Sequence, residues 1–105
     1  DEVGGVLANQ VRDTIKQSVE HSFRVSSSLT RNQLWQALTP QMFRFGVLYQ
    51  ALNRAKKYKV SVTDESAAIE ALGYQPLLVL GAYDNIKITY PEDLALADYL
   101  LRQQV

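Results

Sequence analysis

The sequence predicts an α/β fold, and three patterns of apolar residues carry that prediction. Residues 76–80 form a continuous apolar run of strand length, which is typical of a strand buried on both faces. Residues 3–8 resemble another short buried strand, with glycines where backbones approach closely. Residues 43–55 carry apolar side chains at helical spacing. Because strands and helices alternate along the chain, we expect a sheet that is at least partly parallel.

A hairpin is predicted between the first strand and the first helix. Residues 11–19 and 23–29 form its two sides, and the polar segment 20–22 forms its tip. Apolar and polar side chains alternate in 23–29, as they do in a strand with one apolar side. A two-stranded ribbon of this kind is marginally stable alone. We therefore expect an arm over residues 9–33 that lies against something else, and a partner subunit is one candidate.

The helix that follows the arm is predicted from its end signals. Thr39 is expected to be the N-cap, with Pro40 at the first helical position. Gly46 weakens this start, so the regular helix could begin a few residues later. Lys56 and Lys57 are cations suited to its C-terminus.

The last third of the chain predicts two further helices and a short strand. Residues 64–72 form a short helix that ends at Gly73, and residues 86–88 form the strand. Thr89 and Glu92 have the spacing of a capping box for a helix that extends to about Gln103. Its inward-facing residues are expected to be Leu94, Ala97, Leu100 and Leu101. These strands are few and short for a free-standing doubly wound sheet, which suggests that part of the domain lies outside this chain.

Length and composition limit the classes of function. The chain has 105 residues, 47% hydrophobic and 21% charged, as in one small folded domain. Eleven basic residues balance eleven acidic ones, so we expect no general attraction to nucleic acid or to an anionic membrane. No cysteine is present, which excludes disulfides and thiolate sites and fits an intracellular location. No signal peptide is visible, and the start at Asp1 rather than Met suggests that an upstream portion was removed or not included.

Few residues suggest catalysis by their pattern alone. The single histidine, His21, falls at the predicted hairpin tip and is better read as an exposed turn residue than as a catalytic base. Acidic pairs at 64–65 and 92–93 stand in first helical turns, where carboxylates stabilise the helix dipole. No cluster has metal-ligand spacing, and no glycine-rich phosphate loop is present.

Basic residues offer the more interesting candidates. Lys87 precedes a helix start, near where open α/β sheets bind ligands, so it could hold a phosphate. A solvated surface lysine is the alternative interpretation. The same two interpretations apply to the basic residues on or beside the arm, which are Arg12, Lys16, Arg24 and Arg31.

Four blocks of the chain, in order and spacing, resemble the 2-C-methyl-D-erythritol 4-phosphate cytidylyltransferases. Residues 84–97 (DNIKITYPEDLALA) resemble the family's closing signature, N-I-K-x-T-x-P-E-D-L. Residues 4–16 resemble its G-G-x-L-A…P-V-x-D-T-x-K block, with Gln10 where proline is frequent. Residues 30–43 resemble R-x-x-L-W-x-A-L-T-P-Q-x-F, and residues 63–66 resemble T-D-E-[AS]. The resemblance covers nearly the whole chain.

The resemblance implies a fold and an assembly. Residues 1–105 would be the C-terminal portion of one Rossmann-like nucleotidyltransferase domain, with a protruding β-hairpin dimerisation arm at 9–33 and the remaining strands and helices at 34–105. The family's glycine-rich, basic nucleotide-binding loop has no counterpart here, so the N-terminal CTP-binding portion is expected to be absent. The arm would cross to the second subunit of a cytoplasmic homodimer.

The resemblance also implies a reaction and roles for four residues. The family transfers a cytidylyl group from CTP to 2-C-methyl-D-erythritol 4-phosphate and releases pyrophosphate, with Mg²⁺ on the triphosphate. Lys87 and Arg31 would be catalytic, Lys87 between the reacting phosphates and Arg31 on the substrate phosphate of the neighbouring subunit. Thr14 and Thr39 would contact the substrate. Arg12 and Asp13 could serve either the substrate or the dimer interface.

Two alternatives to an enzyme portion stay open. The chain could be a catalytically inert fragment that supplies dimerisation and the substrate side of the site. A free-standing sugar-phosphate-binding domain of another kind is a weaker possibility. No metal ligand or cofactor-binding residue is predicted within the chain, and neither nucleic acid nor a membrane is an expected partner.

Overall fold

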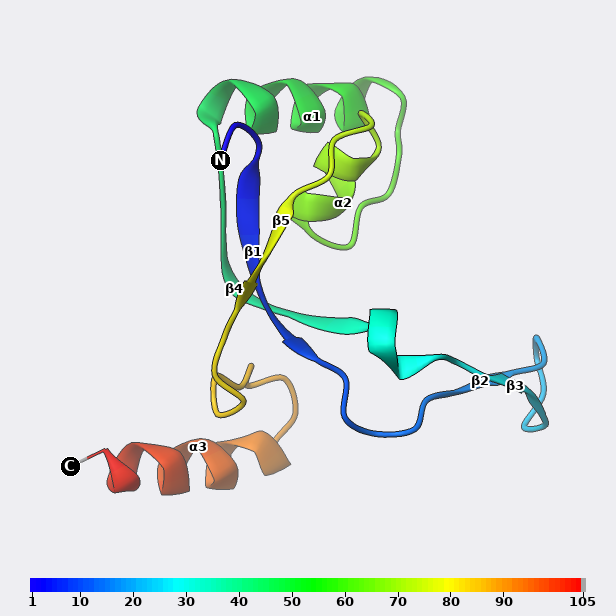
Figure 1. Ribbon diagram of the computed structural model, residues 1–105, viewed down its shortest axis with the longest axis vertical. Coiled ribbons are helices and arrows are strands. Elements are labelled where there is room, and N and C mark those ends of the chain that lie inside the picture. The colour runs from blue at the N-terminus through cyan, green and yellow to red at the C-terminus, as the bar shows by residue number, and fades with distance from the viewer. Residues whose placement is uncertain (105) are drawn as a thin grey trace.

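A three-stranded sheet forms the body of the molecule (Figure 1), in a computed structural model that describes residues 1–104. Its central strand, β1 (Gly4–Gln10), pairs antiparallel with β4 (Trp35–Phe43) and parallel with β5 (Leu77–Leu80). The prediction of a partly parallel sheet is therefore confirmed. Within the described residues, no helix is both long and apolar enough to cross a membrane.

The helix N-terminus predicted at Thr39 and Pro40 is wrong, because both residues lie inside β4. Strand β4 follows β1 along its whole length, and this pairing between distant segments overrides the local Thr-Pro signal. The register of the pairing shifts opposite Val6 and Ala8, so the residues around Pro40 form an irregular stretch. A proline, which has no N–H, is tolerated at such a bulge. The helix begins only at Phe45.

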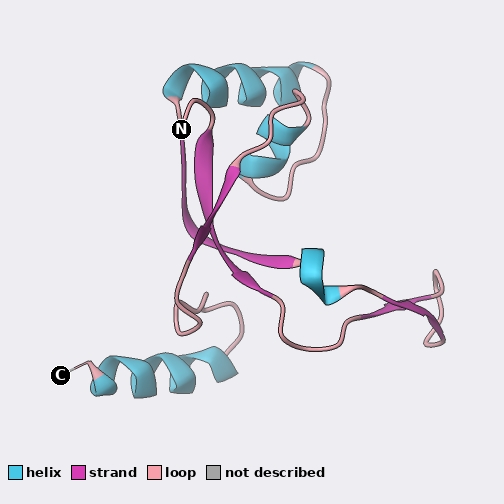
Figure 2. Ribbon diagram, viewed as in Figure 1, coloured by secondary structure: helices cyan, strands magenta, loops and turns pink. Residues whose placement is uncertain are grey.

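Two helices pack together at one end of the sheet (Figure 2). Helix α1 (Phe45–Lys57) ends in the predicted lysines, and α2 (Glu65–Glu70) lies within the predicted segment 64–72. Ala51 of α1 meets Ala68 and the fully buried Ile69 of α2 in the buried core of the described chain. The side chain of Asp64 caps α2 by accepting a hydrogen bond of 2.8 Å from the N–H of Ala67. Gly73 then follows with a φ of +92°, which suits its predicted place past the helix end.

Replacing Asp64 by alanine is expected to lower the free energy of unfolding by about 1–2 kcal/mol, because the cap of α2 is lost. Asp64→Asn keeps a capping oxygen and should retain most of that stability. Urea denaturation of the variants measures the effect. Asp98→Ala, which removes an exposed ion pair with Arg102, is the control and should change stability by less than about 0.5 kcal/mol. Equal effects for Asp64→Ala and Asp98→Ala would contradict the capping role.

Strand β5 and helix α3 (Glu92–Gln103) are present as predicted, but their apolar residues are not covered. The four residues of β5 are between 41% and 75% exposed, so the prediction of burial on both faces is wrong for this chain. None of the described residues of α3 is buried, and Figure 1 shows this helix apart from the body. Its predicted inward face therefore meets no core. Among residues 1–104, no element covers these surfaces, which explains why sequences suited to burial are exposed.

The segment between β5 and α3 differs from its prediction in two ways. Residues 86–88 form no strand, because no neighbouring strand of the described chain pairs with them. The capping box predicted for Thr89 and Glu92 is also wrong, because the Thr89 hydroxyl donates to the carbonyl of Lys87 and the N-cap position is held by Pro91. Asp93, rather than Glu92, accepts hydrogen bonds from the N–H groups of Thr89 and Tyr90, each at 2.9 Å.

Those two hydrogen bonds predict a pH dependence at the start of α3. The bond from Tyr90 and then that from Thr89 lower the pKa of Asp93 below its ordinary value, and desolvation opposes them. A lowered folded-state pKa means that the stabilisation is complete above the unfolded-state pKa and is lost as pH falls through the folded-state pKa. Amide NMR shifts of Thr89 and Tyr90 should follow this acidic titration, and Asp93→Asn should abolish it. A titration that persists in Asp93→Asn would contradict this origin.

The predicted hairpin is confirmed and protrudes from the body (Figure 1). Its paired strands, β2 (Lys16–Ser18) and β3 (Val25–Ser28), are shorter than the predicted ones, and a 3₁₀ turn, η1 (Arg31–Gln33), stands at its base. His21 lies in the tip with a φ of +57° and an exposed side chain, as an ordinary turn residue does. The arm leaves Phe23 and Val25 exposed. It therefore presents apolar side chains that the described residues leave largely uncovered.

Candidate functional site

A cavity of about 1010 Å³ is the main candidate site, and it is called the site cavity below. Its lining combines the irregular part of β4, the start of α2 and the loop after β5. Asn9, next to the end of β1, also lines it, so one side of the cavity lies beyond the carboxyl ends of the parallel pair β1 and β5. Open α/β sheets bind their ligands at this edge. The polar lining residues are Asn9, Gln36, Thr39, Gln41, Thr63, Asp64, Glu65, Tyr83, Asn85, Lys87 and Thr89.

Two of the four sequence-predicted site residues, Thr39 and Lys87, line the site cavity together. Lys87 is exposed in the loop after β5, and Thr39 lies in β4. The side-chain amide of Asn85 connects these segments by donating a hydrogen bond of 2.7 Å to the carbonyl of Thr39. The fold thus places an ammonium group and a hydroxyl group at one cavity, an arrangement suited to a phosphorylated polyol. Their roles stay predictions.

The loop that carries Lys87 is attached to the sheet by a buried amide. Asn9 is 2% exposed, and its Nδ2 donates a hydrogen bond of 3.0 Å to the carbonyl of Ala82. The N–H of Gly81 also donates to the carbonyl of Ala8 at 3.0 Å. Sequence reasoning missed Asn9 and Asn85, because a hydrogen bond between segments distant in sequence leaves no periodic pattern. The available signal was position alone, since Asn9 falls within the matching block 4–16 and Asn85 within the block 84–97.

A second amide holds α2 beside the site cavity. Gln41 of β4 donates from Nε2 to the Asp64 carboxylate at 3.0 Å and accepts from the N–H of Ser66 at 3.2 Å. Ser66 in turn donates to the carboxylate of Glu70 at 2.6 Å. Asp64 therefore serves the helix terminus, as predicted, and is engaged twice, while Glu65 stands in the first turn of α2.

The other two predicted site residues, Thr14 and Arg31, lie on the arm and do not line the site cavity. Both are exposed. Arg31 donates from Nη1 to the carbonyl of Arg12, whose own guanidinium carbon lies 3.6 Å from the centre of the Tyr83 ring. Asp13 is exposed beside them. Within one chain, the structure does not bring the arm residues to Lys87 and Thr39.

The described residues do not fit a resident metal ion. Among residues 1–104, no group of three or more His, Cys, Asp or Glu side chains is placed to hold one. Of the two carboxylates that line the site cavity, Asp64 and Glu65, Asp64 is already engaged as the cap of α2.

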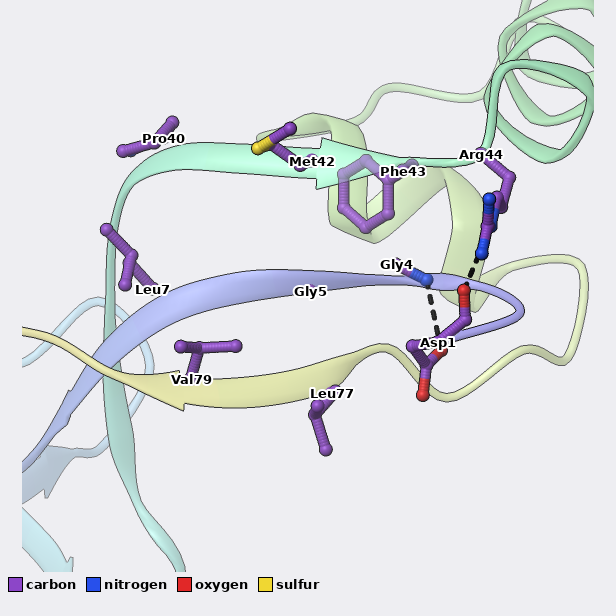
Figure 3. Close-up of a pocket in the computed structure, with 10 residues that line it drawn as sticks. All are labelled: Asp1, Gly4, Gly5, Leu7, Pro40, Met42, Phe43, Arg44, Leu77 and Val79. Atoms are coloured by element: carbon purple, nitrogen blue, oxygen red, sulfur yellow. Dashed lines mark hydrogen bonds between the residues drawn. The ribbon is translucent and has the colours of Figure 1, made fainter.

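A further hollow of about 630 Å³ lies against the sheet and is mainly apolar. Figure 3 shows side chains from all three strands around it, and beside them Arg44 bonded to the carbonyl of Asp1. The apolar lining residues are Leu7, Pro40, Met42, Phe43, Leu77 and Val79. Because this hollow has so few polar groups, it is a surface for packing rather than a site for chemistry.

Comparison with known proteins agrees with this geometry. The family model for 2-C-methyl-D-erythritol 4-phosphate cytidylyltransferase matches residues 1–103. The chain belongs to this family. The cytidylyltransferase of that name from Buchnera aphidicola subsp. Schizaphis graminum is 50% identical over 101 residues, which are 96% of this chain and 43% of the relative. That of Baumannia cicadellinicola subsp. Homalodisca coagulata is 53% identical over 103 residues, again 96% of this chain and 43% of the relative.

Solved cytidylyltransferase structures share the fold. The structure of 2-C-methyl-D-erythritol 4-phosphate cytidylyltransferase from Thermus thermophilus matches with a TM-score of 0.83 and 30% identity, over 96% of this chain and 49% of that one. The Francisella tularensis structure matches with a TM-score of 0.81 and 35% identity, over 93% and 45%. The predicted α/β fold of the family is thus confirmed. The chain spans less than half the length of these cytidylyltransferases.

Proposed function

We propose that this chain is the C-terminal, substrate-side portion of an enzyme that transfers a cytidylyl group from CTP to 2-C-methyl-D-erythritol 4-phosphate. The family membership supports the reaction. The observation that carries the assignment of the site is the shared cavity of Lys87 and Thr39, at the ligand-binding edge of a parallel strand pair. The products would be 4-diphosphocytidyl-2-C-methyl-D-erythritol and pyrophosphate.

The reaction joins two polyanions, so its demands are positioning and neutralisation of charge. A phosphate oxygen of the substrate forms a bond to the α-phosphorus of CTP. The bond from that phosphorus to the bridging oxygen of the β-phosphate breaks, and the electron pair leaves with pyrophosphate. Lys87 would lie between the attacking and the attacked phosphate as a compact positive charge. Thr39, which lines the same site cavity, would hydrogen-bond the substrate.

We propose that the arm completes the active site of a second subunit. Arg31 and Thr14 lie outside the site cavity of their own chain. In a homodimer with crossed arms, Arg31 would hold the substrate phosphate of the partner through its planar fork of donors. Thr14 would add a hydrogen bond to the same substrate. The exposed Phe23 and Val25 support a contact between the arm and another surface.

The CTP side of the site would come from an amino-terminal portion outside these 105 residues. Three features support this: the chain spans 43% of the first relatives, both faces of β5 are exposed, and the hollow of Figure 3 is apolar and uncovered. Mg²⁺ would arrive with the triphosphate of CTP and be held outside the residues described here. A cytoplasmic location is part of the proposal, since phosphorylated substrates do not cross membranes freely.

The alternative is an inert fragment, and pyrophosphate release distinguishes it from an enzyme portion. The chain is mixed with the amino-terminal portion of the Buchnera relative, which is 50% identical where the two overlap, and is supplied with CTP, substrate and Mg²⁺. We expect release from the mixture and little from either part alone. Mixtures that assemble but show no turnover would contradict the enzyme proposal.

A further inference from the structure

Tyr83, in the loop after β5, contacts the base of the arm in two ways. Its ring lies under the guanidinium of Arg12, whose central carbon is 3.6 Å from the ring centre. Its hydroxyl group donates a hydrogen bond of 3.1 Å to the carbonyl of Gln10. Gln10 is the last residue of β1, so both contacts fall where the chain leaves the sheet and enters the arm. A planar guanidinium stacked on an aromatic face is attracted to the ring electrons and restricted in orientation.

Residues on both sides of Tyr83 are attached to the body. The backbone carbonyl of Ala82 accepts from the side chain of the buried Asn9, and the side-chain amide of Asn85 donates to the carbonyl of Thr39. Tyr83 therefore lies between two hydrogen bonds to the body, which restrain the loop that carries it. A contact with such a residue restrains the arm, whereas a contact with a mobile loop would move with it.

The base of the arm is itself a connected unit. Arg31 donates to the carbonyl of Arg12, which ties the segment that leaves the arm to the one that enters it. The N–H of Val11 donates to the carbonyl of Leu34 at 3.0 Å, and this bond joins the same two segments. A contact that restrains Arg12 therefore restrains both sides of the hairpin.

We propose that Tyr83 is a positioning residue that holds the arm at a fixed angle to the sheet through its stack on Arg12. The loop that carries Lys87 and the arm that carries Arg31 are thereby joined at one side chain. The inference rests on the contacts of Tyr83 alone and does not require cytidylyl transfer, so its test needs no substrate.

The absence of cysteine from the chain allows a direct measurement of the arm angle. Ser27→Cys on β3 and Gln50→Cys on α1 place two nitroxide labels at exposed positions, one on the arm and one on the body. Pulsed electron paramagnetic resonance then gives the distribution of distances between the labels. We expect a narrow distribution in the labelled parent and a broad one in Tyr83→Ala, with roughly a tenfold fall in the ratio of docked to undocked arms. Tyr83→Phe keeps the ring and should be intermediate.

Matched variants separate the stack from general loss of structure. Arg12→Gln, which alters an exposed residue on the other side of the contact, removes the stack but keeps the hydroxyl bond to Gln10, so it should broaden the distribution less than Tyr83→Ala does. The double variant should be no broader than Tyr83→Ala alone, because Tyr83→Ala already removes the stack on Arg12. Tyr99→Ala, at an exposed tyrosine of α3, should leave the distribution unchanged. A narrow distribution in both Tyr83→Ala and Arg12→Gln, or a parent already as broad as they are, would overturn the proposal.

Discussion

Replacing Lys87 by alanine in the complete enzyme is expected to lower kcat for cytidylyl transfer by roughly 10²–10³-fold. The physical reason is that a positive charge beside the reacting phosphates stabilises the negative charge that gathers in the transition state. Losing one preorganised group of this kind costs about 3–4 kcal/mol of activation free energy. Lys87→Arg keeps the charge but spreads it over a planar fork, so we expect it to recover only part of the rate. Initial rates of pyrophosphate release give kcat for the parent enzyme and for both variants.

The control for Lys87→Ala is Lys56→Ala. Lys56 is also an exposed lysine, but it lies in the last turn of α1 and does not line the site cavity. Its replacement should leave kcat within about twofold of the parent, since exposed charges far from a site are screened. A rate for Lys87→Ala close to that of Lys56→Ala would remove Lys87 from the catalytic machinery.

Replacing Gly4 by alanine is expected to lower the free energy of unfolding by roughly 3 kcal/mol or more. Gly4 has a φ of +139°, a backbone conformation that L-residues with a side chain rarely adopt. A Cβ there would lie 2.6 Å from the Cα of Phe43 and closer still to the carbonyl oxygen of Met42. These are backbone atoms of β4, so relief would require the strands to separate where β1 and β4 begin their pairing. Urea denaturation of the chain measures the loss.

Gly46→Ala is the matched comparison, because the same substitution is expected to have the opposite sign. Gly46 lies in the first turn of α1, and a Cβ built there meets no atom within 4 Å. Alanine should stabilise the helix by about 0.5–1 kcal/mol. Equal stabilities of Gly4→Ala and the parent would show that β1 and β4 do not approach as closely as described.

The elements predicted correctly were those whose signals are local. The arm was visible from its alternation and polar tip, α1 from helical spacing and terminal lysines, and α2 from its acid and Gly73. The helix start predicted at Thr39 and Pro40 was wrong because a local signal competed with strand pairing between β1 and β4. The sequence of one segment alone does not reveal that pairing. The prediction that β5 is buried was wrong for a different reason. Its composition suits a larger sheet than the described residues contain.

Only those residues of the candidate site that belong to a recognised motif were predicted from the sequence. The resemblance pointed to Lys87 and Thr39, and the fold brings them to one cavity. The side chains that shape this cavity bond to residues distant in sequence. Asn85, for example, donates a hydrogen bond to the carbonyl of Thr39, 46 residues earlier. Sequence periodicity does not predict such a contact. For the same reason, it did not predict the stack of Arg12 on Tyr83.

Mixing two inactive variants of the complete enzyme tests most directly whether each site combines Lys87 of one subunit with Arg31 of the other. Subunits with Lys87→Ala are unfolded, refolded together with subunits carrying Arg31→Ala, and assayed for pyrophosphate release. With crossed arms, a mixed dimer has one site with both residues intact and one with neither, so random mixing should restore about a quarter of the parental rate. If both residues served the same subunit, every site would lack one of them. A mixture that forms mixed dimers but stays as inactive as each variant alone would therefore contradict the shared site.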